Sequence, residues 1–145
     1  MKRRDASYGF KERYDDLNRA YRKALTYGNF NTQLAALAAA VDMPSKRFWV
    51  SVERLVEVIN AMESGGEIRV GHNSPKREMY DELFRRYKAY KAEHPNLSKT
   101  EICSEIIYQP APKFYMKPSW AKKILLKGRD KHRHHHHHHH NHENE

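Results

Sequence analysis

Residues 110–131 carry side chains whose types and spacing suit the binding of phosphate groups. This stretch contains seven lysines or arginines and one aspartate. Where it is helical, the cations gather on the side that the apolar residues leave open, and lysine and serine side chains there can bind phosphate oxygens and reach base edges in a DNA groove. The predicted nucleic-acid-binding residues are Lys113, Lys117, Ser119, Lys122, Lys123, Lys127 and Arg129, together with Lys46 and Arg47 from an equivalent segment earlier in the chain.

The charge of the whole chain favours the same class of partner. The 145 residues include 27 lysines and arginines against 18 acidic residues, which gives a net charge of +9 and a pI near 9.7. Such an excess favours a polyanion: DNA, RNA or an acidic protein surface. The alternative is a solvated helix face whose lysines only aid solubility, because many small soluble proteins are basic.

Motifs of catalytic and cofactor sites are missing from the sequence. It contains no His-Glu-x-x-His, no glycine-rich phosphate loop and no Cys-x-x-Cys. The single cysteine, Cys103, falls on the apolar side of a predicted helix, where it suits a core position. The seven-histidine run His134–His140, natural or a purification tag, would bind transition metals loosely without a defined site. We therefore expect a non-enzymatic protein with no cofactor and no metal site.

The sequence shows no sign of export or of membrane insertion. No apolar run approaches the roughly 18 residues of a membrane-spanning helix. The basic start, Met1-Lys-Arg-Arg-Asp5, is followed by no apolar stretch, so a secretory signal is not expected. One cysteine cannot form an intrachain disulfide, which suits a reducing compartment. The predicted location is the cytoplasm.

The elements that would position the cationic side chains recur in two parts of the chain at a constant offset. Residues 11–22 align with residues 77–88, and six of the twelve pairs are identical. The same register then aligns Phe48 with Phe114 without a gap. One register held over about 45 residues indicates an internal duplication.

Each copy is predicted to form three helices. Apolar residues recur at helical spacing in the first helix, and a hydroxyl side chain, Thr32 or Ser98, caps the second. Glu101 completes a capping box with Ser98, and Pro118 suits the first turn of the third helix. The predicted fold is all-α: a tandem duplication of a three-helix, helix-turn-helix-like unit with a short extended segment before each third helix. Eight residues separate Gln109 from Pro118, however, where a compact helix-turn-helix uses three or four.

The predicted domains follow the duplication. Repeat 1 covers residues 8–64 and the more basic repeat 2 covers residues 76–131, with a linker over 65–75 that has room for a short strand at Glu67–Val70. Residues 132–145 are polar and histidine-rich and are predicted to be disordered. The apolar stripes expected to be buried include Tyr14, Leu17, Tyr21 and Leu25 in the first helix, and Trp120, Ala121, Ile124 and Leu125 in the last.

The two third helices differ in charge. The open side of the copy-one helix carries Glu53 and Glu57, which would repel phosphate. Copy two is therefore predicted to bind nucleic acid, and copy one to face a protein partner or a second copy of the chain. The aromatic residues within 46–49 and 113–115 are expected in the core, and stacking on unpaired bases is the alternative.

Three segments resemble a known family. They are Pro44-Ser-Lys-Arg-Phe-Trp-Val-Ser51, Lys76-Arg-Glu-Met-Tyr80 and Gln109-Pro-Ala-Pro-Lys-Phe-Tyr115. Together they are similar to an uncharacterised family of small basic proteins from gut bacteria, encoded near phage and mobile-element genes. The resemblance covers about residues 14–130 and is most specific at residues 109–115. It implies a phage or mobile-DNA setting and no known activity.

The sequence thus predicts a non-enzymatic nucleic-acid-binding protein, with duplex DNA as the expected ligand of the third helix of repeat 2. The alternative is a structural or assembly component, for instance a phage-associated protein, that meets a protein partner without touching nucleic acid. A contiguous cationic surface on repeat 2 would favour nucleic-acid binding. Scattered cations together with an exposed apolar patch would favour assembly.

Overall fold

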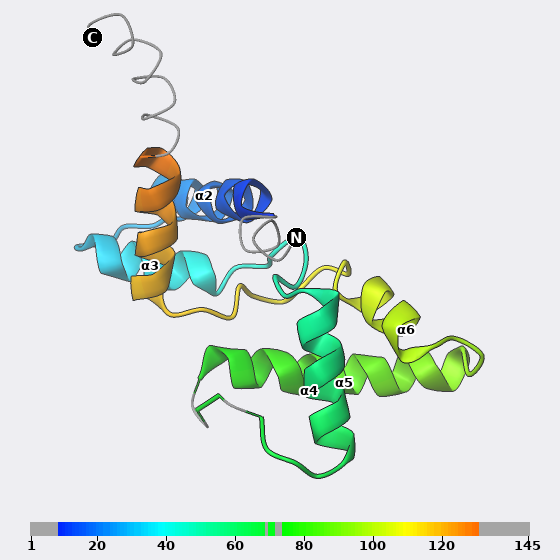
Figure 1. The fold of residues 1–145 in the computed structure, drawn as a ribbon. Helices are drawn as coiled ribbons and strands as arrows, with labels where there is room; N and C mark the ends of the chain where they lie inside the picture. The colour runs from blue at the N-terminus through cyan, green and yellow to red at the C-terminus, as the bar shows by residue number, and fades with distance from the viewer. Residues whose placement is uncertain (1–8, 69, 72–73, 131–145) are drawn as a thin grey trace, which may run out of the picture. The chain divides into compact units, whose positions relative to one another are not determined.

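The computed structural model describes residues 9–68, 70–71 and 74–130. Figure 1 shows helices joined by loops, and none of these described residues belongs to a β-strand. The predicted all-α class is therefore confirmed. The histidine run and the predicted disordered segment 132–145 lie outside the described residues.

The helix boundaries repeat with the offset that aligns residue 11 with residue 77 in the sequence. By this offset the start of α3 corresponds to the start of α6, the end of α2 to the end of α5, and the start of α4 to the start of the helix over residues 118–130. The described helices are α2 (Phe10–Tyr27), α3 (Gln33–Val41), α4 (Val52–Glu63), α5 (Pro75–Glu93), α6 (Lys99–Ile106) and the 118–130 helix, which runs to the edge of the described part.

Short-range signals set the ends of these helices. The Glu101 backbone N–H donates to Ser98 Oγ at 3.1 Å, and the Ser98 backbone N–H donates to the Glu101 carboxylate at 2.8 Å, so the predicted capping box is confirmed. The Ala35 N–H donates to Thr32 Oγ1 at 3.1 Å at the start of α3. Pro118 occupies the first helical position of its helix, as predicted, where its missing N–H costs little.

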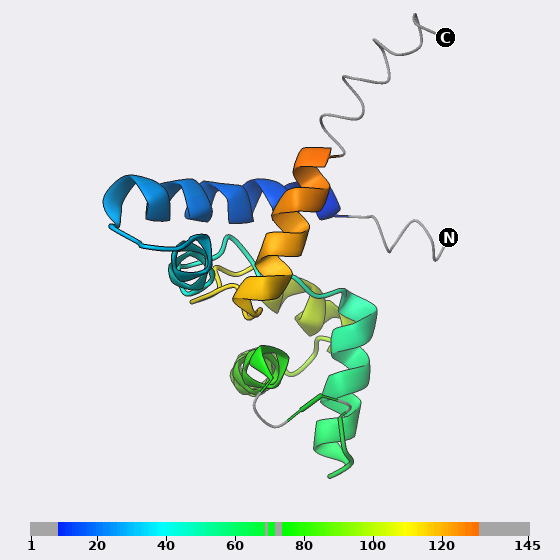
Figure 2. The same ribbon diagram turned by 90° about the vertical axis from the view of Figure 1, so that its left-hand side faces the viewer.

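The helices divide into two compact units. Of the described residues, the terminal unit contains 9–41 and 117–130, and the central unit contains those between 42 and 116. α2, α3 and the 118–130 helix therefore belong to the terminal unit, whereas α4, α5 and α6 belong to the central unit (Figures 1 and 2). Each unit combines two helices from one half of the sequence with one helix from the other half.

This partition differs from the domain boundaries predicted from the sequence. The predicted repeats, 8–64 and 76–131, do not coincide with the compact units, and the predicted linker, 65–75, lies inside the central unit. The physical reason is that α4 packs on α5 and α6 through its buried stripe, which includes Leu55 and Val58. An apolar stripe can be buried against any matching pair of helices, so its periodicity does not say which pair it will meet.

A large apolar cluster forms the core of the central unit. The rings of Phe48 and Tyr115 lie nearly parallel in it, with centroids 6.0 Å apart. The guanidinium of Arg86 lies over the Phe48 ring, 4.8 Å from its centroid. The three helices contribute buried side chains to this cluster, among them Leu55, Val58, Ile59, Tyr80, Leu83, Tyr87, Ile102, Cys103 and Ile106.

The core of the terminal unit is built largely from small side chains. Small residues let two helices approach closely, but they bury less apolar surface than leucine or isoleucine. The 118–130 helix comes close to α2, because a Cβ atom added to Gly128 would collide with the ring of Tyr14. Besides Asp16, the buried residues among those described in the unit are Leu17, Ala20, Ala24, Ala36, Leu37, Ala40, Val41, Ala121, Ile124 and Gly128.

Two loop segments of the central unit pair with each other. Ser45 and Ala111, which align by the same sequence offset as the helix boundaries, exchange two backbone hydrogen bonds of 2.9 and 3.0 Å in an isolated antiparallel bridge. These segments precede α4 and the 118–130 helix, where short extended stretches were predicted. The predicted strand at Glu67–Val70 is wrong for its described residues, which are not in a strand. Ile68 packs into the core cluster there, so burial rather than strand pairing explains this apolar position.

Candidate nucleic-acid interface

The positive charge of the chain is concentrated in one of its two units. Among the described residues, the terminal unit contains ten lysines and arginines against four acidic residues, whereas the central unit contains 11 against 11. The described part of the terminal unit thus carries a net charge of +6, and that of the central unit carries none. A polyanion would therefore be attracted far more strongly by the terminal unit.

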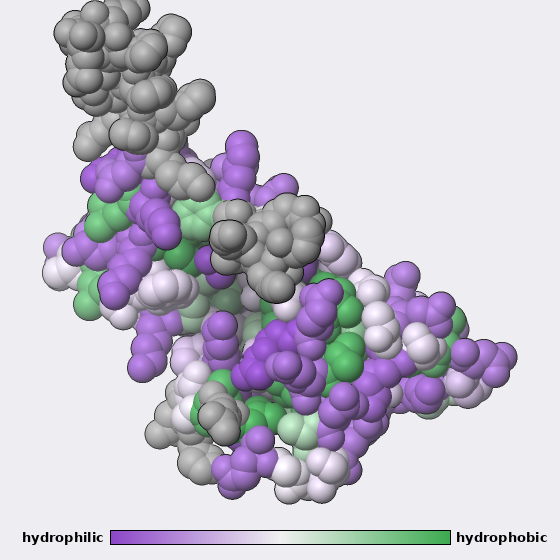
Figure 3. Space-filling view, in the orientation of Figure 1, coloured by the Kyte–Doolittle hydropathy of each residue, from purple (hydrophilic) through white to green (hydrophobic). Residues whose placement is uncertain are grey.

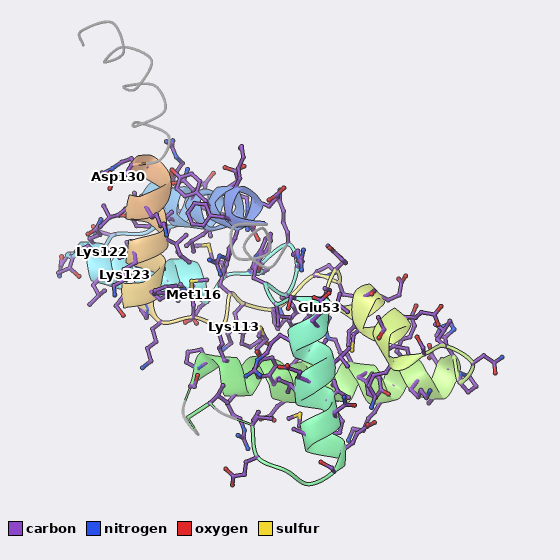
Figure 4. All side chains as sticks on the ribbon, in the orientation of Figure 1. Glu53, Lys113, Met116, Lys122, Lys123 and Asp130 are labelled. Carbon is purple, nitrogen blue, oxygen red and sulfur yellow. The ribbon has the colours of Figure 1, made fainter. Side chains whose placement is uncertain are left out.

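The 118–130 helix presents its polar residues on the side opposite its buried stripe. With 3.6 residues per turn, Ala121, Ile124 and Gly128 fall on one side and are buried. Lys122 and Lys123 project from the helix in Figure 4, and its visible surface in Figure 3 is mostly hydrophilic with apolar atoms between. The predicted binding residues that this helix exposes are Ser119, Lys122, Lys123, Lys127 and Arg129.

The cations of this helix have no acidic partner among the described residues. No ion pair joins Lys122, Lys127 or Arg129 to a described carboxylate, and the same holds for Lys117, which is exposed just before the helix. The ammonium of Lys123 lies 5.8 Å from the centroid of the Trp120 ring. A ligand phosphate would therefore not have to displace a carboxylate of the described chain to reach these lysines.

The remaining predicted residues, Lys46, Arg47 and Lys113, lie in the central unit. Arg47 is held in place there: its Nε donates to the Phe48 carbonyl at 3.0 Å, and its guanidinium lies 4.1 Å from the centroid of the Tyr108 ring. Lys113 forms an ion pair with Glu78 at 3.0 Å. The predicted site is thus divided between the units, and within the central unit these two side chains already serve internal contacts.

Residues of α4 that correspond to the cationic helix face form internal contacts in the central unit. Glu53 and Glu57 are exposed, as their acidic face predicted, and Arg54 Nη1 bonds Glu57 Oε1 at 3.1 Å. Lys99 Nζ lies 2.6 Å from the carboxylate of Glu63 near the end of the helix. Figure 4 labels Glu53 in the first turn of α4. This face carries negative charge and offers little to a phosphate.

The aromatic residues proposed for base stacking are mostly in the core. Phe48, Phe114 and Tyr115 are buried, which confirms the core prediction. Trp49 is half-buried, and its Nε1 donates to Ser45 Oγ at 2.9 Å. These rings are therefore not accessible platforms for a base.

Other large apolar side chains, which helical periodicity assigned to the core, are exposed. Leu25 and Trp120 were predicted to be buried, but they are 52% and 48% exposed. The 118–130 helix buries a stripe through Ala121, Ile124 and Gly128, which turns Trp120 to the edge of that stripe. The sequence signal that could have revealed it was the glycine at 128, since a close helix contact there fixes the rotation of the helix.

Burial shifts the pKa of two side chains that lie outside the 118–130 helix, Cys103 and Arg13. Burial raises the pKa of the Cys103 thiol to about 11, so the side chain is a neutral core residue, as predicted. Burial also lowers the pKa of the Arg13 guanidinium in α2. Arg13 Nε is buried without a hydrogen-bond partner among the described residues, so this cation adds positive potential to the terminal unit without a carboxylate beside that atom.

Comparison with protein-family models, with curated protein sequences and with solved structures found no match to this chain. Among the described residues, no helix is both long and apolar enough to cross a membrane. Within the same part of the chain, histidine, cysteine and acidic side chains do not gather into a group of three or more that could hold a metal ion.

Proposed function

We propose that the protein is a non-enzymatic, cytoplasmic nucleic-acid-binding protein and that the terminal unit is its binding module. The observation that carries this proposal is the segregation of charge, a net +6 among the described residues of the terminal unit against zero among those of the central unit. In helix-turn-helix proteins the third helix of a three-helix unit enters the major groove, and its basic side chains contact phosphates on either side. The 118–130 helix has the place and the charge for that role, with duplex DNA as the expected ligand.

We further propose that the chain is a duplicated three-helix unit whose third helices are exchanged between the copies. Supporting observations are the helix boundaries that recur at the offset of the sequence repeat and the matched burial of Phe48 and Phe114, which are 1% and 3% exposed. The exchange accounts for the long connection before Pro118. A compact helix-turn-helix needs three or four residues there, whereas a segment that carries its helix to another unit needs more.

The lysines of the binding helix provide a quantitative test, because phosphate neutralisation releases condensed counterions. Changing Lys122, Lys123 and Lys127 to alanine should weaken binding to every sequence alike. About three lost phosphate contacts would flatten the slope of log K against log salt by roughly 3 on duplex DNA. The measurement is fluorescence anisotropy of a labelled duplex over a series of salt concentrations.

Two matched variants separate a binding surface from a general effect of charge. Changing Lys76, Arg85 and Lys88 to alanine removes the same charge from exposed positions of the central unit, and it should leave the salt slope almost unchanged. Changing Glu53 and Glu57 to alanine should leave the affinity equal or slightly higher through reduced repulsion. If the triple variant of the binding helix binds as tightly as wild type at every salt concentration, the proposal is wrong.

Exposed apolar side chains favour a second candidate function, assembly with a protein partner. In this function the protein is a phage-associated component whose cations meet an acidic protein partner, and the exposed apolar residues of α2 and α3 contact that partner or a second copy of the chain. Light scattering tests the second copy: a dimer that Leu25→Ser with Leu34→Ser converts to a monomer would favour assembly. The exposed residues, from the end of α2 to the start of α3, are Leu25, Tyr27, Phe30 and Leu34.

A further inference from the structure

The binding helix carries an exposed aromatic side chain beside its lysines. Trp120 is 48% exposed, and the Lys123 ammonium lies 5.8 Å from the centroid of its ring. In a helix, residues three and seven positions further on lie on nearly the same side, so Lys123 and Lys127 follow Trp120 along one edge of the open face. Lys127 lies about 10 Å from Trp120 along the helix axis. The three side chains form a strip, Trp120–Lys123–Lys127, with an apolar ring at one end and two cations beyond it.

The corresponding strip of α4 has no such character. In the register of the repeat, Arg54, Glu57 and Ala61 align with Trp120, Lys123 and Lys127. Arg54 and Glu57 bond each other at 3.1 Å, and Arg54 lies over the Tyr80 ring of its own unit, 5.8 Å from the centroid. In α4 this strip thus serves internal contacts, whereas in the 118–130 helix the same positions present a ring and two ammonium groups to solvent.

We propose, on the basis of the proposed function, that Trp120 is a stacking platform for an unpaired base, so that the terminal unit binds single-stranded nucleic acid in addition to duplex DNA. Lys123 and Lys127 hold the phosphates that flank the stacked nucleotide. Proteins that bind single strands combine cations that follow the backbone with aromatic rings that stack on bases. Bases of an intact duplex are stacked on one another, so a ring on a convex helix reaches a base face only where the base is unpaired.

The proposal predicts a change in the emission of Trp120 when a base stacks on it. The chain has two tryptophans, and Trp49→Phe leaves Trp120 as the sole reporter. Titration with oligothymidylate should quench its emission. An abasic oligonucleotide of equal length, which has the same phosphates and no bases, should bind more weakly and leave the emission nearly unchanged.

Two substitutions at Trp120 separate stacking from apolar contact, measured by anisotropy in the otherwise wild-type chain. Trp120→Leu should weaken binding of oligothymidylate about 5- to 100-fold, the range for loss of one base–aromatic stack. Trp120→Phe should retain most of the affinity because it keeps a ring. Neither substitution should alter binding of the abasic strand or of a blunt duplex.

Distinct results would overturn the inference and the proposed function. Equal affinity of wild type and Trp120→Leu for oligothymidylate, or equal loss on the abasic strand, would show that the ring is no platform, while lysine-dependent binding of duplex DNA would leave the proposed function in place. Binding to no nucleic acid would overturn both. Tighter binding to polyglutamate than to oligothymidylate, with the same dependence on Trp120, would assign the strip to an acidic protein.

Discussion

Gly128 determines how closely the 118–130 helix can approach α2. It is buried within a helix, where glycine is normally less favourable than alanine by about 0.5–1 kcal/mol. The ring of Tyr14 occupies the space that a Cβ atom would need. The place of Gly128 corresponds to Met62 in α4, and Tyr14 corresponds to Tyr80. Tyr80 belongs to the apolar cluster of the central unit, and Met62 is partly buried against that cluster, so a larger side chain stands in α4 at the position where the 118–130 helix has glycine.

Replacing this glycine tests that contact. Gly128→Ala should destabilise the protein by about 1–3 kcal/mol, the usual cost of overpacking a core, although alanine is the better helix former. Thermal or urea unfolding measures the change. Gly66→Ala is the control, because a Cβ atom there would meet other atoms only at 3.5 Å, an ordinary contact distance. Stabilisation by Gly128→Ala would mean that Tyr14 moves aside freely and that the helix contact is loose.

Residue types alone did not separate cations that are available for a ligand from cations already in use. Arg47 and Lys113 have the same charge as Lys122, yet Arg47 bonds a backbone carbonyl and Lys113 bonds Glu78. The partner of Arg47 is a backbone atom, and the partner of Lys113 is distant in the sequence but close in the fold. A pattern of residue types reveals neither kind of partner. The lysines of the 118–130 helix could be predicted as exposed because the local apolar stripe fixes the opposite side.

The ends of the helices illustrate what short-range chemistry determines. α6 has eight residues, and its N-terminus depends on the reciprocal hydrogen bonds of Ser98 and Glu101. Ser98→Ala should therefore lower the free energy of unfolding by about 1 kcal/mol. Ser104→Ala is a matched control in the same helix, since its hydroxyl donates only to the Thr100 carbonyl and its loss should change stability by less than about 0.5 kcal/mol. Equal effects of the two substitutions in urea unfolding would contradict the role of the capping box.

Helix limits were predictable because caps, prolines and apolar spacing act within a few residues. It was harder to predict which face each helix buries. Leu25 and Trp120 have the spacing of core residues but are about half exposed, whereas the alanines and Gly128 of the same helices are buried. Periodicity locates an apolar face to within one residue on either side, and the packing partner decides the rest.

At the scale of the whole molecule, the compact units are not the halves of the sequence. The periodicity of apolar residues could not have shown this. The buried stripes of α4 and of the 118–130 helix have the same residue spacing, so either helix could pack on either pair of preceding helices. The Ser45–Ala111 bridge joins the two segments that lead to these third helices. A consequence is that the cationic helix, although it follows α5 and α6 in the sequence, belongs to the unit whose other helices are α2 and α3.

Substitutions at two aligned buried residues, one in α4 and one in the 118–130 helix, test which helices each of these two helices packs against. Val58 in α4 and Ile124 in the 118–130 helix align in the register of the repeat and are 1% and 2% exposed. A buried, unpaired carboxylate is strongly destabilising, so Ile124→Asp should raise hydrogen exchange in α2 and α3 and leave α5 and α6 protected. Val58→Asp should do the reverse. If the 118–130 helix instead packed on α5 and α6, Ile124→Asp would raise hydrogen exchange in those two helices. Hydrogen exchange of the full chain, measured by mass spectrometry, therefore gives opposite results for the two arrangements.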